Sequence, residues 1–198
     1  MAASDGRPRC YAYTLIEMMM VIVIVGIIAA TAIPSFQPNV YGQLQAAARL
    51  IGDDVSYARN LAVVYNSKYR IDFDLTQNQY VLRHSGSNTA LNTLPKSPSQ
   101  NSSDPADRQI TRLEEALSSG VIVRVYAVYS LSTPAQSIGD IELGPLGETT
   151  RPDETIVWLG AGSGSDARYL SVRISPVTGL YRIGTLQGTA PTLATPAN

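Results

Sequence analysis

The sequence predicts an α+β protein, in which one long N-terminal helix packs on an antiparallel β-sheet formed by the rest of the chain. Three observations predict this fold class. The 19 residues from Leu15 to Ile33 are apolar or glycine except for Glu17 and Thr31. Apolar residues with helical spacing then continue to Tyr65. Beyond that point, short runs alternate between polar and apolar residues, as half-buried strands do.

This pattern divides the chain into five segments. We expect residues 1–12 to be a short leader, residues 13–34 an apolar transmembrane and assembly helix, and residues 35–65 its amphipathic continuation. Residues 66–184 should form a β-rich globular head. Residues 185–198 carry no charge and should form a flexible tail.

The apolar run is predicted to be a helix although its centre is rich in Val and Ile. It is too long for a strand, and a lone segment in lipid can satisfy its backbone only as a helix. At about 1.5 Å per residue its length nearly matches a hydrocarbon core of about 30 Å. Arg7 and Arg9 precede it. The N-terminus is therefore expected in the cytoplasm and the head beyond the membrane.

The second half of the helix is expected to present one apolar face to the head or to neighbouring helices. Pro34 lies where the helix would leave the membrane, and we expect a kink or local melting there. Asn66-Ser67 is a plausible end of the helix. The apolar stripe consists of Leu44, Ala47, Ala48, Ile51, Val55, Ala58, Ala62 and Tyr65.

Period-2 patterns predict the strands of the head. Residues 84–109 are rich in Ser, Asn, Pro and Asp and are expected to form a long loop. Residues 111–117 should form a short helix capped by Thr111, with Glu114 at capping-box spacing. The predicted strands are 68–74 and 79–83, which form a hairpin, followed by 121–130, 138–143, 155–159, 169–174 and 180–183.

Residues 12–17 carry the most specific signal in the chain. They read Ala12, Tyr13, Thr14, Leu15, Ile16 and Glu17, with basic residues before them and an apolar run after them. This segment closely resembles the signal of type IV prepilins and pseudopilins. Tyr13 stands where the family usually has Phe, and Ala12 where it usually has Gly. Gly26 and Pro34 also match residues common in such helices.

The resemblance implies a processing step and a set of partners. Prepilin peptidase would cut between Ala12 and Tyr13, and the new amine of Tyr13 would be methylated. The mature chain would then assemble with other pilin or pseudopilin subunits at an inner-membrane assembly platform. Its assembly residues would be Thr14, Leu15, Ile16, Glu17, Gly26 and Pro34.

Glu17 has a physical reason to seek a partner. A carboxylate at membrane depth costs about 2.5–3.5 kcal/mol on insertion scales. The amine of Tyr13 in a cleaved neighbour would be cationic and could pair with Glu17, which would fix the axial register. The alternative is that Glu17 reaches the interface without a partner.

A different reading of the N-terminus is a secretory signal peptide. Arg7, Arg9 and the apolar run lead to Ala30-Thr31-Ala32, an A-x-A cleavage pattern. The mature protein would then begin at Ile33 and be a soluble secreted β-domain. Against this alternative, Glu17 falls in the lead-in to the apolar core, and the amphipathic pattern continues directly past Pro34.

The head is similar to H-type minor pseudopilins of type II secretion (GspH) and their FimT-like relatives. The likeness lies in residues 51–59, the paired strands near 70–74 and 79–82, and the order of turns and strands from 144 to 183. It implies a non-catalytic minor pseudopilin that supports protein secretion. The subunit would sit as a single-pass protein in the inner membrane, head in the periplasm, before joining a filament.

A DNA-uptake pilus is the remaining alternative of this class. Arg168, Arg173 and Arg182 alternate along strands, and the tail has no Lys or Arg. Clustered phosphate contacts are therefore not evident. The 15 basic and 16 acidic residues give a net charge of −1, which also disfavours nucleic acid as a partner.

Enzyme, cofactor and metal sites are not expected. Cys10 is the single cysteine, so an internal disulfide is impossible. His84 falls in the predicted polar loop, where solvation is the simplest role. Residues 160–165 are Gly- and Ser-rich but lack the Lys-Ser/Thr end of a phosphate loop. Glu114 and Glu115 are expected on a solvated helix face. The acids Asp140, Glu142, Asp153 and Asp166 are scattered, so no calcium loop is evident.

Overall fold

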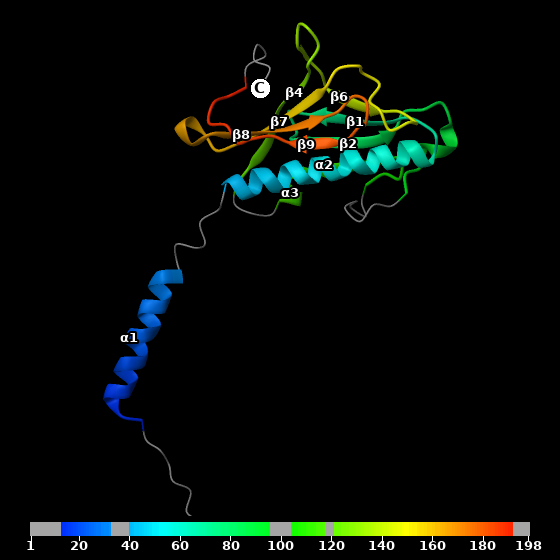
Figure 1. The fold of residues 1–198 in the computed structure, drawn as a ribbon. Helices are drawn as coiled ribbons and strands as arrows, with labels where there is room; N and C mark the ends of the chain where they lie inside the picture. The colour runs from blue at the N-terminus through cyan, green and yellow to red at the C-terminus, as the bar shows by residue number, and fades with distance from the viewer. Residues whose placement is uncertain (1–12, 33–39, 96–103, 118–120, 192–198) are drawn as a thin grey trace, which may run out of the picture. The chain divides into compact units, whose positions relative to one another are not determined.

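The computed structural model describes residues 13–32, 40–95, 104–117 and 121–191 (Figure 1). The chain separates into two compact units, Met1–Gln37 and Pro38–Asn198. The predicted leader, the Pro34 kink and the last part of the predicted tail lie outside the described residues.

The first unit contains one helix, α1 (Leu15–Ala32). The second unit begins with a second helix, α2 (Val40–Val64). Both fall within the range 13–65 that was predicted to be helical.

The amphipathic pattern of α2 determines which face it buries. Leu44, Ala48, Ile51 and Ala58 are fully buried, as the stripe predicts. The helix ends in a Schellman motif, in which the Ser67 N–H donates to the Ala62 carbonyl at 3.0 Å and the Asn66 N–H donates to the Val63 carbonyl at 3.3 Å. Asn66 occupies the left-handed position with φ of 47°. The predicted stop at Asn66-Ser67 therefore has a backbone explanation.

The strands form two antiparallel sheets rather than the single sheet that was predicted. The first sheet has the order β3-β2-β1-β6, with β1 (Tyr69–Asp74), β2 (Gln79–His84), β3 (Arg108–Arg112) and β6 (Asp140–Leu143). The second has the order β5-β4-β7-β8-β9, with β4 (Val123–Ser130), β5 (Gln136–Ser137), β7 (Thr155–Ala161), β8 (Arg168–Ile174) and β9 (Tyr181–Ile183).

Strand β3 lies where the sequence predicts loop and a helix cap, so that prediction is wrong. Thr111 pairs with Tyr80 of β2 and does not cap a helix. The short helix α3 (Leu113–Ala116) begins after Arg112, which makes no side-chain capping bond. The pairing with β2 decides the conformation, and it is not visible in the local sequence. Two 3₁₀ turns, Thr89–Asn92 and Gly164–Asp166, complete the described elements.

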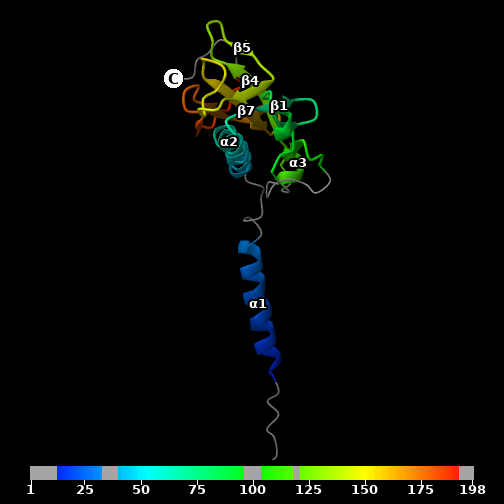
Figure 2. The same cartoon turned by 90° about the vertical axis from the view of Figure 1, so that its right-hand side faces the viewer.

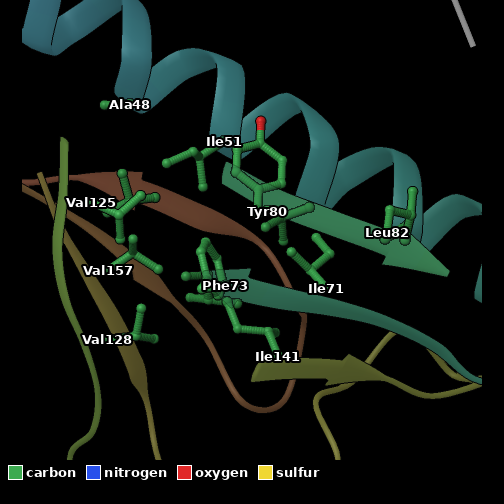
Figure 3. Packing of buried hydrophobic residues seen from close by; sticks show 14 of the residues in the cluster. Ala48, Ile51, Ile71, Phe73, Tyr80, Leu82, Val125, Val128, Ile141 and Val157 are labelled. Carbon is green, nitrogen blue, oxygen red and sulfur yellow. The ribbon is translucent and has the colours of Figure 1, made fainter. Parts of the chain in front are cut away.

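The core of the head lies between α2 and the two sheets, with α2 running along one side of the strands (Figures 1 and 2). Figure 3 shows Ile51 of α2 above Tyr80, Ile71 and Val125 from both sheets. The predicted class is thus confirmed, since a helix packs on antiparallel sheets in an α+β head.

The side chain of Asn78 joins the two sheets. It sits in the β1–β2 turn with φ of 51°. Its amide nitrogen donates to the Val123 carbonyl at 2.8 Å, and its amide oxygen accepts from the Val125 N–H at 3.0 Å. The Asn78 side-chain amide therefore bonds to β4 in the same way as the backbone of an adjacent strand would.

The first residues of the predicted tail are also paired. Gln187 and Tyr169 exchange two backbone hydrogen bonds of 2.8 Å each, so the chain beyond β9 still follows β8 at this point. The flexible tail that was predicted from residue 185 therefore does not begin there. Uncharged residues can pair as well as any others when a strand lies beside them.

Candidate assembly site

Helix α1 exposes apolar side chains on all sides within its unit. Apolar residues occur around the whole circumference of α1, which lacks the one-sided apolar stripe of α2. A helix that is apolar on all sides is typically buried in a protein core or in a membrane. The side chains that are 48–79% exposed are Tyr13, Leu15, Ile16, Met18, Met19, Met20, Val21, Ile22, Val23, Ile24, Val25, Ile27 and Ile28.

The start of α1 is set by Thr14. The Glu17 N–H donates to the Thr14 Oγ1 at 3.3 Å and to the Thr14 carbonyl at 3.1 Å. Thr14 therefore occupies the N-cap position, and Glu17 the third helical position, which is the spacing of a capping box. The carboxylate of Glu17 is exposed in the first turn, where the helix dipole favours a negative charge.

Of the remaining predicted site residues, the structure describes three and leaves two outside the described ranges. Leu15 and Ile16 are exposed at the start of α1. Gly26 lies inside α1, and a Cβ added there would meet nothing within 4 Å. Ala12 and Pro34 lie outside the described residues.

In the portions of the chain that the structure describes, no helix meets the length and hydropathy required of a membrane span.

The head contains one buried carboxylate that the sequence analysis did not single out. Asp54 of α2 is 5% exposed. Its Oδ2 accepts from the Tyr80 hydroxyl at 2.7 Å and from the Thr111 hydroxyl at 3.2 Å. Its Oδ1 accepts from the Gln109 amide at 3.3 Å. Figure 3 shows the Tyr80 hydroxyl pointing up toward α2. The carboxylate therefore fastens α2 to β2 and β3.

Burial governs the titration of this group. Desolvation raises the pKa of Asp54, and its three hydrogen-bond donors only partly offset that effect. Burial, together with the nearby Asp54 charge, raises the pKa of Tyr80 well above its ordinary value. The phenol proton therefore stays on Tyr80 and is donated to the carboxylate. The helical stripe could have revealed Asp54, because it lies three residues after Ile51 and four before Ala58.

His84 is buried, so the prediction of a solvated loop histidine is wrong. It is the last residue of β2, where the alternation from Tyr80 and Leu82 turns it inward. Its Nε2 lies 2.7 Å from the Ser67 hydroxyl and its Nδ1 lies 2.9 Å from the Asn92 amide oxygen. These bonds anchor the chain after α2 and the first 3₁₀ turn to the end of β2.

A hollow of about 500 Å³ opens beside the first sheet and has a polar lining. Its two guanidinium groups are already bound by carboxylates. Arg83 lies 2.6 Å from Asp72, and Arg108 lies 2.8 Å from Asp107. Among the described residues no group of three or more His, Cys, Asp or Glu side chains could hold a metal ion.

Comparison with known protein families agrees with the N-terminal signal. Residues 7–33 match the family described as the prokaryotic N-terminal methylation motif. This match confirms the resemblance of residues 12–17 to a prepilin-type signal and supports a type IV pilin-like protein. The motif suggests a membrane-anchored filament subunit.

Two solved structures are similar to this chain. One is the minor pseudopilin EpsH from the type 2 secretion system of Vibrio cholerae, with 11% identity and a TM-score of 0.46, covering 71% of this chain and 95% of that one. The other is the type IV minor pilin FimU of Pseudomonas aeruginosa, with 16% identity and a TM-score of 0.42, covering 72% and 93%. A search of curated proteins by sequence gave no match.

Proposed function

We propose that this chain is a non-catalytic minor pseudopilin of a type II secretion system, or a minor subunit of a related type IV pilus-like filament. The observation that carries the proposal is the prepilin-type segment directly joined to a helix whose described apolar side chains lie exposed within their own unit. An amphipathic helix could cover itself with its own head. A helix that is apolar all round requires lipid or other helices.

The subunit is proposed to pass through membrane insertion, processing and assembly in that order. It first rests in the inner membrane as a single-pass protein, with its N-terminus in the cytoplasm and its head in the periplasm. Prepilin peptidase then removes residues 1–12, and the Tyr13 amine is methylated. The assembly platform next moves the subunit into a filament with other pseudopilins. In that filament Glu17 pairs with the Tyr13 amine of a neighbour.

Analysis of the mature N-terminus tests the processing step. The full chain is expressed with a prepilin peptidase and its companion subunits, and the N-terminal peptide is identified by mass spectrometry. We expect a chain that begins at Tyr13 with a methylated amine. A chain that begins at Ile33 would instead establish the secreted β-domain and overturn the proposal.

Substitution of Glu17 tests the assembly step. Glu17→Gln keeps the size of the side chain and the backbone cap but removes the charge. An unpaired carboxylate at this depth costs several kcal/mol. We therefore expect that the charge of Glu17 serves to pair with an amine. We expect normal cleavage and membrane insertion but at least about tenfold less co-purification with companion subunits.

Glu17→Asp is the matched control, since it keeps the charge, and it should retain most of the assembly. Incorporation of the Gln variant at the wild-type level would remove the role assigned to Glu17.

A further inference from the structure

The second sheet of the head has an excess of positive charge that the first sheet lacks. Its five strands contain four arginines and no Asp or Glu. The strands of the first sheet contain four arginines and four acidic residues, so their charges balance. The arginines of the second sheet are Arg124, Arg168, Arg173 and Arg182.

The face of the second sheet opposite the core, the outer face, has an apolar floor of its own. On β7, Val157 and Leu159 belong to the core that α2 covers, so the alternate residues Ile156 and Trp158 point to the outer face. The floor consists of Ala127, Ile156 and Trp158, with Tyr129, Leu131 and Tyr169 packed against it.

The strand register places three arginines around this floor. Residues directly opposite each other in paired strands lie on the same face. Arg173 lies opposite Ile156, and Arg182 lies opposite Arg173. Arg124 lies opposite Gly160, which is four residues along β7 from Ile156, or about 13 Å. The outer face therefore carries positive charge on both sides of its floor.

The stability of the head does not explain these charges. Like charges directly opposite on neighbouring strands are destabilising, as Arg173 and Arg182 are. Glu154 lies 4.0 Å from Arg173. Within the part of the chain that the structure describes, no carboxylate pairs with Arg182 or Arg124, and both residues are exposed. Carboxylates from another molecule would relieve the repulsion.

Exposed tyrosine completes the surface. Tyr126 is 45% exposed, and its ring meets that of Tyr169 edge-on with the centroids 5.0 Å apart. Gly160 makes room for this pair, because a Cβ there would lie 3.2 Å from the Tyr169 ring. Aromatic and arginine side chains are the types enriched in the contacts that dominate protein–protein binding.

We propose that the outer face of the second sheet binds an acidic surface segment of a companion filament subunit. Arg124, Arg173 and Arg182 pair with its carboxylates, and Tyr126 packs against its apolar atoms. This inference rests on the proposed function, in which the chain joins a filament with companion subunits.

Charge and size favour this partner over others. The chain has a net charge of −1, so it does not attract a long polyanion such as a nucleic acid from a distance, whereas a short acidic segment needs only the local arginines. The exposed side chains on this face are far fewer than the 20–30 or so residues of a standard interface, so binding from solution would be weak. A subunit held in the same filament has a high effective concentration, and a weak contact then suffices.

Photo-crosslinking in cells tests the contact with the full chain. The photo-reactive amino acid benzoylphenylalanine replaces Tyr126, and the chain is expressed with prepilin peptidase and its companion subunits. We expect a crosslink to a companion subunit, located by mass spectrometry in a segment rich in Asp and Glu. The same probe at Leu75, which is 47% exposed in the turn between β1 and β2, should give less of this product.

Substitution of the paired arginines tests the role of charge. The double variant Arg173→Gln/Arg182→Gln should lower the yield of the crosslink about fivefold, and Arg173→Lys/Arg182→Lys should retain most of it. The matched control is Arg108→Gln/Arg112→Gln, which removes two positive charges from β3 of the first sheet and should stay within about twofold of wild type.

Three results would overturn the inference. They are a crosslink from Tyr126 only to an exported protein or to nucleic acid, an unchanged yield in the Gln double variant of β8 and β9, and an equal loss in the β3 control. Failure of the proposed function is distinguishable, because the wild-type chain would then lack the cut before Tyr13 and would not co-purify with companion subunits. A correctly cut chain that co-purifies with them but gives no crosslink from Tyr126 contradicts this inference alone.

Discussion

At the scale of single residues, two neighbouring aspartates attach α2 to both sheets. Asp54 binds β2 and β3 of the first sheet through Tyr80 and Thr111. The Oδ1 of Asp53 accepts from the Tyr181 hydroxyl of β9 at 3.2 Å. One carboxylate is buried and the other exposed because successive helical residues point about 100° apart. The helix is therefore held in register with each sheet by a separate polar contact.

The burial of Asp54 gives stability a definite pH dependence. The pKa of Asp54 in the folded chain lies above the unfolded value near 3.8. The contribution of Asp54 to the free energy of unfolding is therefore fully present below pH 3.8 and is lost as the pH rises through the folded pKa. The free energy of unfolding of the wild type minus that of Asp54→Asn should therefore fall between about pH 4 and the folded pKa. Urea unfolding at several pH values measures it.

Asp53→Asn is the matched control for this measurement, since it changes an adjacent carboxylate of the same helix. A pH-dependent difference of the same size in that variant would contradict the assignment to Asp54. Asp54→Ala should be more costly than Asp54→Asn at every pH, by about 1–3 kcal/mol. It leaves the Tyr80, Thr111 and Gln109 donors buried without their acceptor.

At the scale of secondary-structure elements, Asn78 connects the turn of one sheet to a strand of the other. We expect Asn78→Gly to lower the free energy of unfolding by about 2 kcal/mol. Two buried hydrogen bonds are lost at about 1 kcal/mol each, whereas glycine accepts the positive φ without strain. Chemical denaturation measured by circular dichroism gives the change.

Asn66→Gly is the control for Asn78, because it also replaces an asparagine with positive φ. Asn66 is exposed at the end of α2, and its substitution should change stability by less than about 0.5 kcal/mol. Equal effects in the two variants would mean that the backbone conformation, not the bonds to β4, determines the cost.

Elements whose signal is local could be predicted from the sequence. The α2 stripe, the Asn66 stop and the β1–β2 hairpin all follow from spacing within a few residues. Strand β3 could not be predicted, because a long segment rich in Ser, Asn and Asp precedes it and Thr111 looks like a cap. Its partner β2 is far enough away that only the assembled sheet reveals the pairing.

The candidate site shows the same division. Residues 12–17 carry their signal in a contiguous motif and were found directly, and Thr14 caps α1 at the spacing of a capping box. The roles of Asp54 and His84 were missed because the fold brings their partners to them. Asp54 bonds to side chains of β2 and β3, and His84 bonds to Ser67 and Asn92. The helical period places Asp54 on a buried face, and the strand period does the same for His84. Neither period identifies the groups to which these side chains would bond.

At the scale of the whole molecule, the two units differ in whether their apolar side chains are buried within the unit. The unit from Pro38 to Asn198 buries a continuous core of its own, whereas the described large side chains of α1 lie exposed within their own unit. We expect a fragment that begins at Pro38 to stay in solution without detergent and to unfold in one cooperative thermal transition. Differential scanning calorimetry tests this.

A second fragment that begins at Asp53 provides the control. It lacks Leu44, Ala47, Ala48 and Ile51, all of which are fully buried, and it should show no cooperative transition. If the fragment from Pro38 also unfolds without a transition, then α1 contributes to the folding of the head and the two units are not independent.

The Asn78 side chain has a further consequence for β4, because it occupies backbone groups that another strand could otherwise bind. An outer strand with free N–H and C=O groups invites another chain to add to it, and such pairing leads to aggregation. In this head, Asn78 occupies the Val123 carbonyl and the Val125 N–H, and the Ile138 N–H occupies the Val128 carbonyl at 2.9 Å. These three backbone groups of β4 are therefore closed to a strand from another chain.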